Sequence, residues 1–251
     1  MQNLMPRILG LRINRLATLG LVFGLAIAGG MLTARAEEAR TAESRTFDVL
    51  IKNKPSGEYK IVYDQVDPTT TKVSISAQVK LVVLLYPYRY SMRATEMWRE
   101  GVLESFECET VDDGTKTTVS ANFKQPKPSV TVNGKELPEA TPCLWATTYT
   151  LQPNTTTATS LPLLDVDNGE TKTGALKRLE AQTVRVGEES LRCERFRATG
   201  ANPTDLLFDD RGRLVRQSFV DEGYPTEIRL RTVKSIPVEA ASGSEGNLGA
   251  P

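Results

Sequence analysis

Hydrophobic and polar residues alternate over much of this 251-residue chain, with the period of two that is typical of β-strands. In the clearest run, polar residues separate five apolar positions, which are Val73, Ile75, Ala77, Val79 and Leu81. Such a strand buries one face and exposes the other to water, as strands of antiparallel sheets commonly do. Further strands are predicted over residues 47–51, 58–65, 130–132, 183–186, 190–198 and 226–233.

Glycine-containing turns separate the strands and suggest how they pair. A three-residue loop at residues 99–101 would place Glu96 opposite Glu104 on the apolar face. The Asp113-Gly114 pair predicts a two-residue turn, with Cys108 opposite Val119. The apolar face would then continue over three neighbouring strands.

A third hairpin is predicted at residues 210–212, with Phe208 opposite Leu214 and Leu207 opposite Val215. About ten strands joined in sequence order predict an all-β fold, in which one large antiparallel meander sheet curves into a half-barrel or closes into a barrel. No helix longer than a few turns is expected.

The segment at residues 138–162 interrupts this pattern. It is irregular, rich in Thr and Pro, and contains Trp145 and Tyr149. We expect one irregular capping or crossing segment here, with room for a short helix. Its role is open at this stage.

Residues 1–36 have the three parts of a secretory signal peptide. Arg7, Arg12 and Arg15 precede an uncharged apolar run from Leu16 to Leu32, and the sequence TARA ends the segment. This pattern predicts cleavage before Glu37 and a periplasmic or secreted protein. An uncleaved N-terminal membrane anchor is the alternative, since the 17-residue run is at the lower limit for a span.

The rest of the chain has a simple predicted organisation. Residues 37–45 form a charged, flexible lead-in, residues 46–237 a single β domain, and residues 238–251 a disordered tail without apolar periodicity. No further apolar stretch is long enough to span a membrane, so the mature chain is expected to have no membrane span.

Composition and charge narrow the function classes. The chain has no histidine, which excludes a Ser-His-Asp triad, a Cys-His dyad and imidazole metal sites. The formal charge is zero and falls to −4 after signal cleavage, with 27 basic against 31 acidic residues. This balance gives no support for nucleic-acid binding and argues against general adhesion to anionic membranes. We expect no cofactor and no enzymatic activity.

Two further features bear on metals and covalent structure. Cys108, Cys143 and Cys193 permit one disulfide and one remaining thiol, in three alternative pairings. The sequence from Asp165 to Gly169 is similar to the start of a calcium loop, but Leu176 stands where the EF-hand needs a glutamate. No metal site is therefore predicted.

Three motifs suggest a relationship. The stretches EMWREGVL at residues 96–103, DDG at 112–114 and LFDDRGRLV at 207–215 resemble a family of exported bacterial β-rich proteins of unknown function. The resemblance covers about residues 46–234 and implies no particular reaction. The architecture is also similar to that of the periplasmic half-barrel lipoprotein carriers, an analogy of fold that does not establish function.

Side chains on the predicted apolar face are the candidate binding residues. The aromatic and aliphatic ones, with a carboxylate pair among them, are Tyr86, Tyr88, Tyr90, Met92, Trp98, Phe106, Glu96 and Glu104. If Glu96 and Glu104 face each other in apolar surroundings, the pKa of at least one of them is raised, as it is for carboxyl groups at acid/base catalytic sites. Core packing for the aromatics and structural bonding for the carboxylates are the competing interpretations.

Three functions follow from these residues. The first is a non-enzymatic exported domain that binds a lipid, another hydrophobic ligand or an envelope component on the concave sheet face. The second is a structural or protein-interaction module of the cell envelope, which binds envelope protein and has a filled core. The third is a hydrolase that uses Glu96 and Glu104.

Overall fold

The computed structural model describes residues 40–238, apart from residues 84, 85, 125, 126, 139, 155, 156, 201 and 222. The predicted signal peptide and, after Val238, the predicted tail lie outside the described residues. The described residues contain strands, turns and loops and no helix. Accordingly, no helix in this part of the chain is long and apolar enough to cross a membrane.

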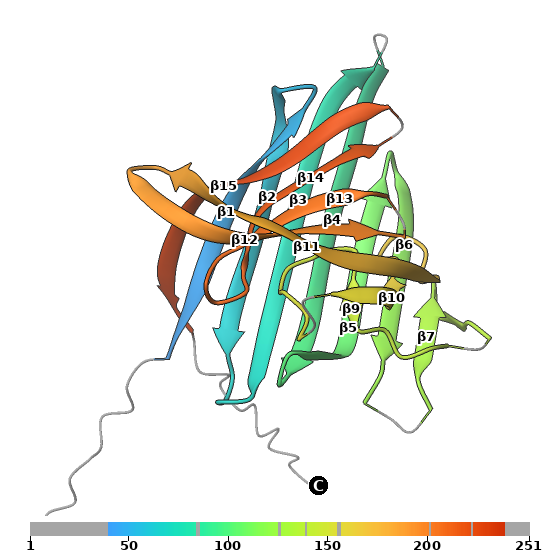
Figure 1. Ribbon diagram of the computed structural model, residues 1–251. Helices are drawn as coiled ribbons and strands as arrows, with labels where there is room; N and C mark the ends of the chain where they lie inside the picture. The colour runs from blue at the N-terminus through green and yellow to red at the C-terminus, as the bar shows by residue number, and fades with distance from the viewer. Residues whose placement is uncertain are drawn as a thin grey trace, which may run out of the picture. The chain divides into compact units, whose positions relative to one another are not determined.

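The strands belong to one sheet and are numbered as in Figure 1. Their bounds are β1 Thr41–Ile51, β2 Lys54–Gln65, β3 Thr70–Val83, β4 Tyr86–Arg99, β5 Val102–Asp112, β6 Thr115–Asn122, β7 Ser129–Val132, β8 Lys135–Glu136, β9 Trp145–Ala146, β10 Ala158–Leu164, β11 Thr171–Val186, β12 Glu189–Thr199, β13 Thr204–Phe208, β14 Leu214–Asp221 and β15 Tyr224–Pro237.

Sequential strands pair antiparallel almost throughout, as the meander prediction requires. The order is β8-β7-β6-β5-β4-β3-β2-β1-β15-β14-β13-β12-β11-β10-β9, so β1 and β15 are neighbours in the middle of the sheet. The two-residue strands β8 and β9 are its edges, and the sheet therefore stays open. β9 and β10 pair parallel. In Figure 1, the orange strands β11 to β14 cross in front of the blue and green strands β1 to β4. The all-β half-barrel prediction is confirmed, with fifteen strands in place of about ten.

The predicted register of the β4–β5 hairpin is wrong. Its turn is the two-residue pair Glu100-Gly101, with φ of 50° and 76°, which are the signs that a type I′ turn requires. A β-bulge then leaves Glu104 without a Cα partner in the register, so that Glu96 lies opposite Phe106. The carboxylate pair expected from the three-residue loop does not form.

The other hairpins agree better with the sequence. The Asp113-Gly114 turn places Cys108 opposite Val119, as predicted. In the third hairpin Phe208 lies opposite Leu214, as predicted. A bulge after that pair places Leu207 opposite Arg216 in place of Val215.

The N-terminal boundary also differs from the prediction. Residues 41–45, expected to be part of a flexible lead-in, belong to β1. All of them pair with β15, and from Glu43 onward they also pair with β2. Arg45 is buried, with only 3% of its surface exposed. The charges in this segment are therefore bound within the fold, which composition alone could not show.

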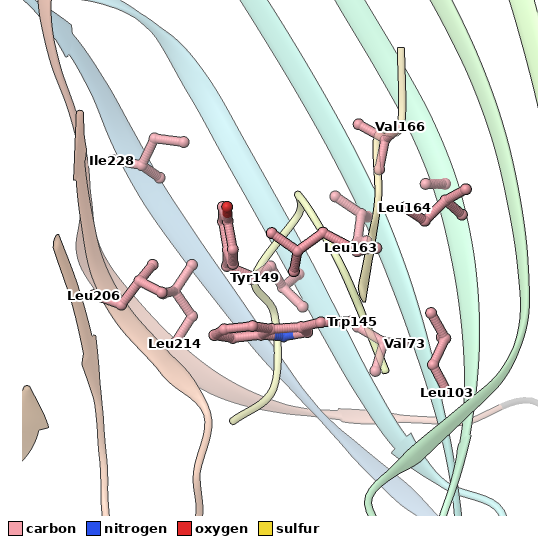
Figure 2. Packing of buried hydrophobic residues seen from close by; sticks show 14 of the residues in the cluster. Val73, Leu103, Trp145, Tyr149, Leu163, Leu164, Val166, Leu206, Leu214 and Ile228 are labelled. Atoms are coloured by element: carbon pink, nitrogen blue, oxygen red, sulfur yellow. The ribbon is translucent and has the colours of Figure 1, made fainter. Parts of the chain in front are cut away.

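The inner face of the sheet forms a single core. It contains the alternating residues of β1 to β6, the inward residues of β10 to β15, and side chains of the segment before β10. Figure 2 shows the ring of Trp145 between Leu206 and Leu214 on one side and Val73 and Leu103 on the other. Because both halves of the curled sheet meet this segment, the interior is packed with side chains.

Candidate functional site

The inner face is covered by an irregular segment, residues 143–153, which we call the plug. It supplies Trp145 and Tyr149, both at most 2% exposed, whose rings meet edge to face at 4.8 Å. Tyr149 has a φ of 51°, a left-handed conformation that is uncommon for a non-glycine residue. Such a conformation persists only where the surrounding packing fixes it.

Backbone hydrogen bonds fix both ends of the plug. At its start, the Leu144 and Thr147 amides donate to the carbonyls of Pro162 (3.1 Å) and Leu164 (3.0 Å). At its end, the Gln152 amide donates to the Gly212 carbonyl at 2.8 Å. The plug is thus attached to β10 and to the β13–β14 turn.

Glu96 attaches the middle of the plug to β4. Its carboxylate is fully buried and accepts hydrogen bonds from the Trp98 indole at 2.7 Å and from the hydroxyls of Thr148 and Thr150. Burial raises the pKa of Glu96, and the three donors partly oppose this effect. Tyr63 adds a bond from its hydroxyl to the Thr150 carbonyl at 2.7 Å. The arrangement satisfies a buried acid and fastens the plug.

A second buried network lies beside the end of the plug. Arg45 donates to the Leu214 carbonyl at 2.8 Å and pairs with Glu43 at 2.7 Å and with Asp209. Its guanidinium lies 5.6 Å from the centre of the Tyr63 ring, within reach of a cation–π interaction. This network joins β1, β2 and the β13–β14 turn, so it has an evident structural role.

The structure separates the candidate residues into three groups. Met92, Trp98 and Phe106 lie in the core with at most 5% exposure. Tyr88 and Tyr90 are partly buried, and the Tyr90 hydroxyl donates to Asp167 at 3.1 Å. The side chain of Tyr86 lies outside the described part of the chain.

Glu104 does not share a site with Glu96. It is partly exposed and pairs with Arg99 at 2.8 Å and with Lys124 at 3.8 Å. Glu96 lies opposite Phe106 and is enclosed by the plug. The two carboxylates expected for a hydrolase are therefore bound separately, each by its own partners.

The possible metal ligands are likewise occupied. Asp165 pairs with Lys172, and Asp167 accepts the Tyr90 bond. Within the described residues no group of three or more Cys, Asp or Glu side chains is arranged to hold a metal ion. The three cysteines, Cys108, Cys143 and Cys193, are buried free thiols.

Sequence reasoning did not find the plug threonines. Thr148 and Thr150 occur in a Thr-rich stretch without periodicity, and only the fold brings them to Glu96. The signal available was the presence of two large aromatic residues, Trp145 and Tyr149, in an otherwise polar irregular segment.

The fold and the covered inner face define a class, an open β-barrel-like sheet whose interior is filled by its own chain. The chain belongs to the family described as a domain of unknown function, DUF6134, whose sequence pattern matches residues 47–231. The expectation of a β-rich family of unknown function is confirmed. Comparison with the curated proteins gives no match.

Among solved structures, a β-barrel-like protein has a similar fold. It is a protein of the domain of unknown function DUF1849 from Brucella abortus, whose crystal structure matches with a TM-score of 0.57 and 8% sequence identity. The match covers 78% of this chain and 98% of that one. At this identity the likeness is one of fold alone.

Proposed function

We propose that this protein is an exported, non-enzymatic β-domain that acts as a structural or protein-interaction module of the cell envelope. The observation that carries this proposal is the plug. Trp145 and Tyr149 occupy the inner face, where a half-barrel would otherwise hold a ligand. Export rests on the signal-like residues 1–36 of the sequence.

The packing disfavours a ligand on the inner face. A hydrophobic ligand that reached Trp98 or Phe106 would first have to displace Trp145 and break the Thr148 and Thr150 bonds to Glu96. Leaving a buried carboxylate without these donors is costly, at about 1–3 kcal/mol or more. Binding energy from the ligand would have to offset that cost.

The outer face offers accessible contacts instead. A groove of about 620 Å³ crosses the outward side of β2 to β7, lined mainly by short hydroxyl side chains and by Lys60, Arg93 and Glu107. None of these three charged groups forms an ion pair with another described residue. Such unpaired surface charges are available to a protein partner, and complementary charges would set specificity.

Native mass spectrometry of gently purified protein tests the proposal. The expected mass is that of the bare chain, and an apolar probe such as benzene should give no thermal shift. Trp145→Ala is the positive control, because removing the indole opens a cavity in an apolar site, where small apolar molecules bind. A thermal shift of the wild type with benzene would overturn the filled-module proposal. A copurified lipid would also overturn it if the lipid is retained when the exposed cations of the β3–β4 hairpin, Lys80 and Arg89, are replaced by glutamate.

A further inference from the structure

The β3–β4 hairpin extends beyond its neighbours. β3 pairs with β2 only as far as Val79, and β4 pairs with β5 only from Tyr90 onward. In the strand register, residues 80–83 and 86–89 are therefore partnered with each other, from Lys80 opposite Arg89 to Val83 opposite Tyr86, and the Asp113 amide donates to the Arg89 carbonyl at 2.8 Å at the base of the extension. In Figure 1 this hairpin rises above the adjacent strands.

The described side chains nearest the end of the extension are uncharged. They are those of Leu81 and Val82 on β3 and of Pro87 and Tyr88 on β4. Val82 is 71% exposed, the highest value among the exposed large hydrophobic residues of the described chain, and Pro87 is also exposed. When a partner covers exposed apolar side chains, the complex is stabilised by about 25 cal/mol for each Å² of apolar surface removed from water.

Two cations lie directly below these uncharged residues. Lys80 and Arg89 are exposed and are cross-strand partners. Like charges in this position repel each other. Neither forms an ion pair with a described residue.

These cations border a groove of about 550 Å³ on the outward side of the hairpin. Its other polar lining includes Gln78, Ser91 and one acidic residue, Asp113. An anion in the groove would relieve the repulsion between Lys80 and Arg89.

We propose that this hairpin docks the protein on a lipid bilayer that contains anionic headgroups. We call residues 80–82 and 87–89 the hairpin arms. The apolar arm residues enter the outer part of the bilayer, and Lys80 and Arg89 bind headgroup phosphates in the groove. This inference goes beyond the proposed function and does not depend on it.

The negative net charge of the domain does not oppose this docking. Screening limits interactions between exposed charges to about 8–10 Å at physiological ionic strength, so the local pair of cations decides the contact. On the other side of the hairpin, Tyr90 bonds to Asp167, whose pKa is raised mainly by burial and further by the nearby carboxylates of Asp165, Asp112 and Asp221. This asymmetry orients the cationic outer side toward the headgroups.

Vesicle flotation of the full chain tests the proposal. We expect binding to vesicles of phosphatidylglycerol with phosphatidylcholine and weaker binding to phosphatidylcholine alone. Lys80→Glu/Arg89→Glu should weaken partitioning at least about thirty-fold, since each lost basic residue near an anionic surface contributes about 1 kcal/mol and the two new carboxylates are repelled. Val82→Asp should weaken it about ten-fold, because the apolar tip would carry a charge into the bilayer.

Matched controls separate this site from general effects. Lys60→Glu/Arg93→Glu makes the same charge change in the other outer groove, and Val102→Asp changes another exposed valine, 47% exposed, which pairs with Arg99 at the opposite end of β4. All variants share the apolar residues 16–32, so differences between them report the hairpin. Circular dichroism confirms that each variant is folded.

The possible outcomes are distinct. Weaker binding of both hairpin variants with unchanged control variants supports the proposal. No vesicle binding by the wild type, equal losses in the control variants, or docking of the hairpin on a protein without affinity for lipid overturns it. An inorganic-phosphate effect without vesicle binding also overturns it. None of these results changes the number of ligands bound in the core, so failure here is distinguishable from failure of the filled-module proposal.

Discussion

Replacing Trp145 by alanine tests whether the plug stabilises the fold. The indole is fully buried, and its ring centre lies 4.8 Å from that of Tyr149 and 6.0 Å from that of Phe208. Truncating such a side chain costs about 3–5 kcal/mol. Against this, the indole N–H has no hydrogen-bond partner among the described residues, and removing a buried unpaired donor returns about 1–3 kcal/mol. Subtracting the midpoints of the two ranges gives an expected loss of about 2 kcal/mol.

Urea denaturation measures this loss as a lower midpoint with an unchanged slope. Trp145→Phe is the matched control, because it keeps an aromatic ring and removes the unpaired N–H. We expect its free energy of unfolding within about 1.5 kcal/mol of the wild type. The reasoning is refuted if Trp145→Ala costs less than about 1 kcal/mol, or if Trp145→Phe costs as much as Trp145→Ala.

Three further predictions concern buried ionisable groups. Burial raises the pKa of Glu96 above its ordinary value of 4.5, so the folded state binds this proton more tightly than the unfolded state. The free energy of unfolding should therefore fall as pH rises from the unfolded-state pKa through the folded-state pKa. Urea titrations should show that Glu96→Gln removes this fall; an unchanged pH dependence would contradict it. Arg45→Met should cost about 3–5 kcal/mol by removing the ion-pair partner of the buried Asp209, whereas Glu43 stays paired with Arg213. Arg231→Met, at an exposed ion pair, should cost much less, and equal costs in denaturation would argue against the network. Burial raises the pKa of Cys108 to about 12 and that of Cys193 to about 11. A thiol reagent at neutral pH should therefore label the native protein slowly and the unfolded protein fully. Rapid labelling of the native protein would count against the burial of Cys108, Cys193 and Cys143.

The local pattern predicted most of the fold. Alternation from Val73 to Leu81 predicted β3, and the Asp113-Gly114 turn fixed the β5–β6 register. Both signals act over a few residues, since side-chain direction alternates along a strand and a two-residue turn requires positive φ. The same reasoning failed at Arg99-Glu100-Gly101, because the turn has two residues and a bulge at Glu104 then shifts the register again.

The candidate site depended on that one register. A shift of two positions moved Phe106 opposite Glu96 and left Glu104 with Arg99. Arg45 was likewise assigned to a flexible segment, because its partner Asp209 is 164 residues away in the sequence. Local patterns contain no information about partners at such separations.

By itself, the sequence determined that the chain folds into an antiparallel sheet with one apolar face, because the alternation of residues fixes which side chains share a face. Only the tertiary structure decided what covers that face. It brought Trp145, Thr148 and Thr150 of an irregular segment onto Glu96, and so filled the interior that the sequence left open for a ligand. The physical reason is that the curling of a sheet and the path of a long loop depend on contacts between distant segments.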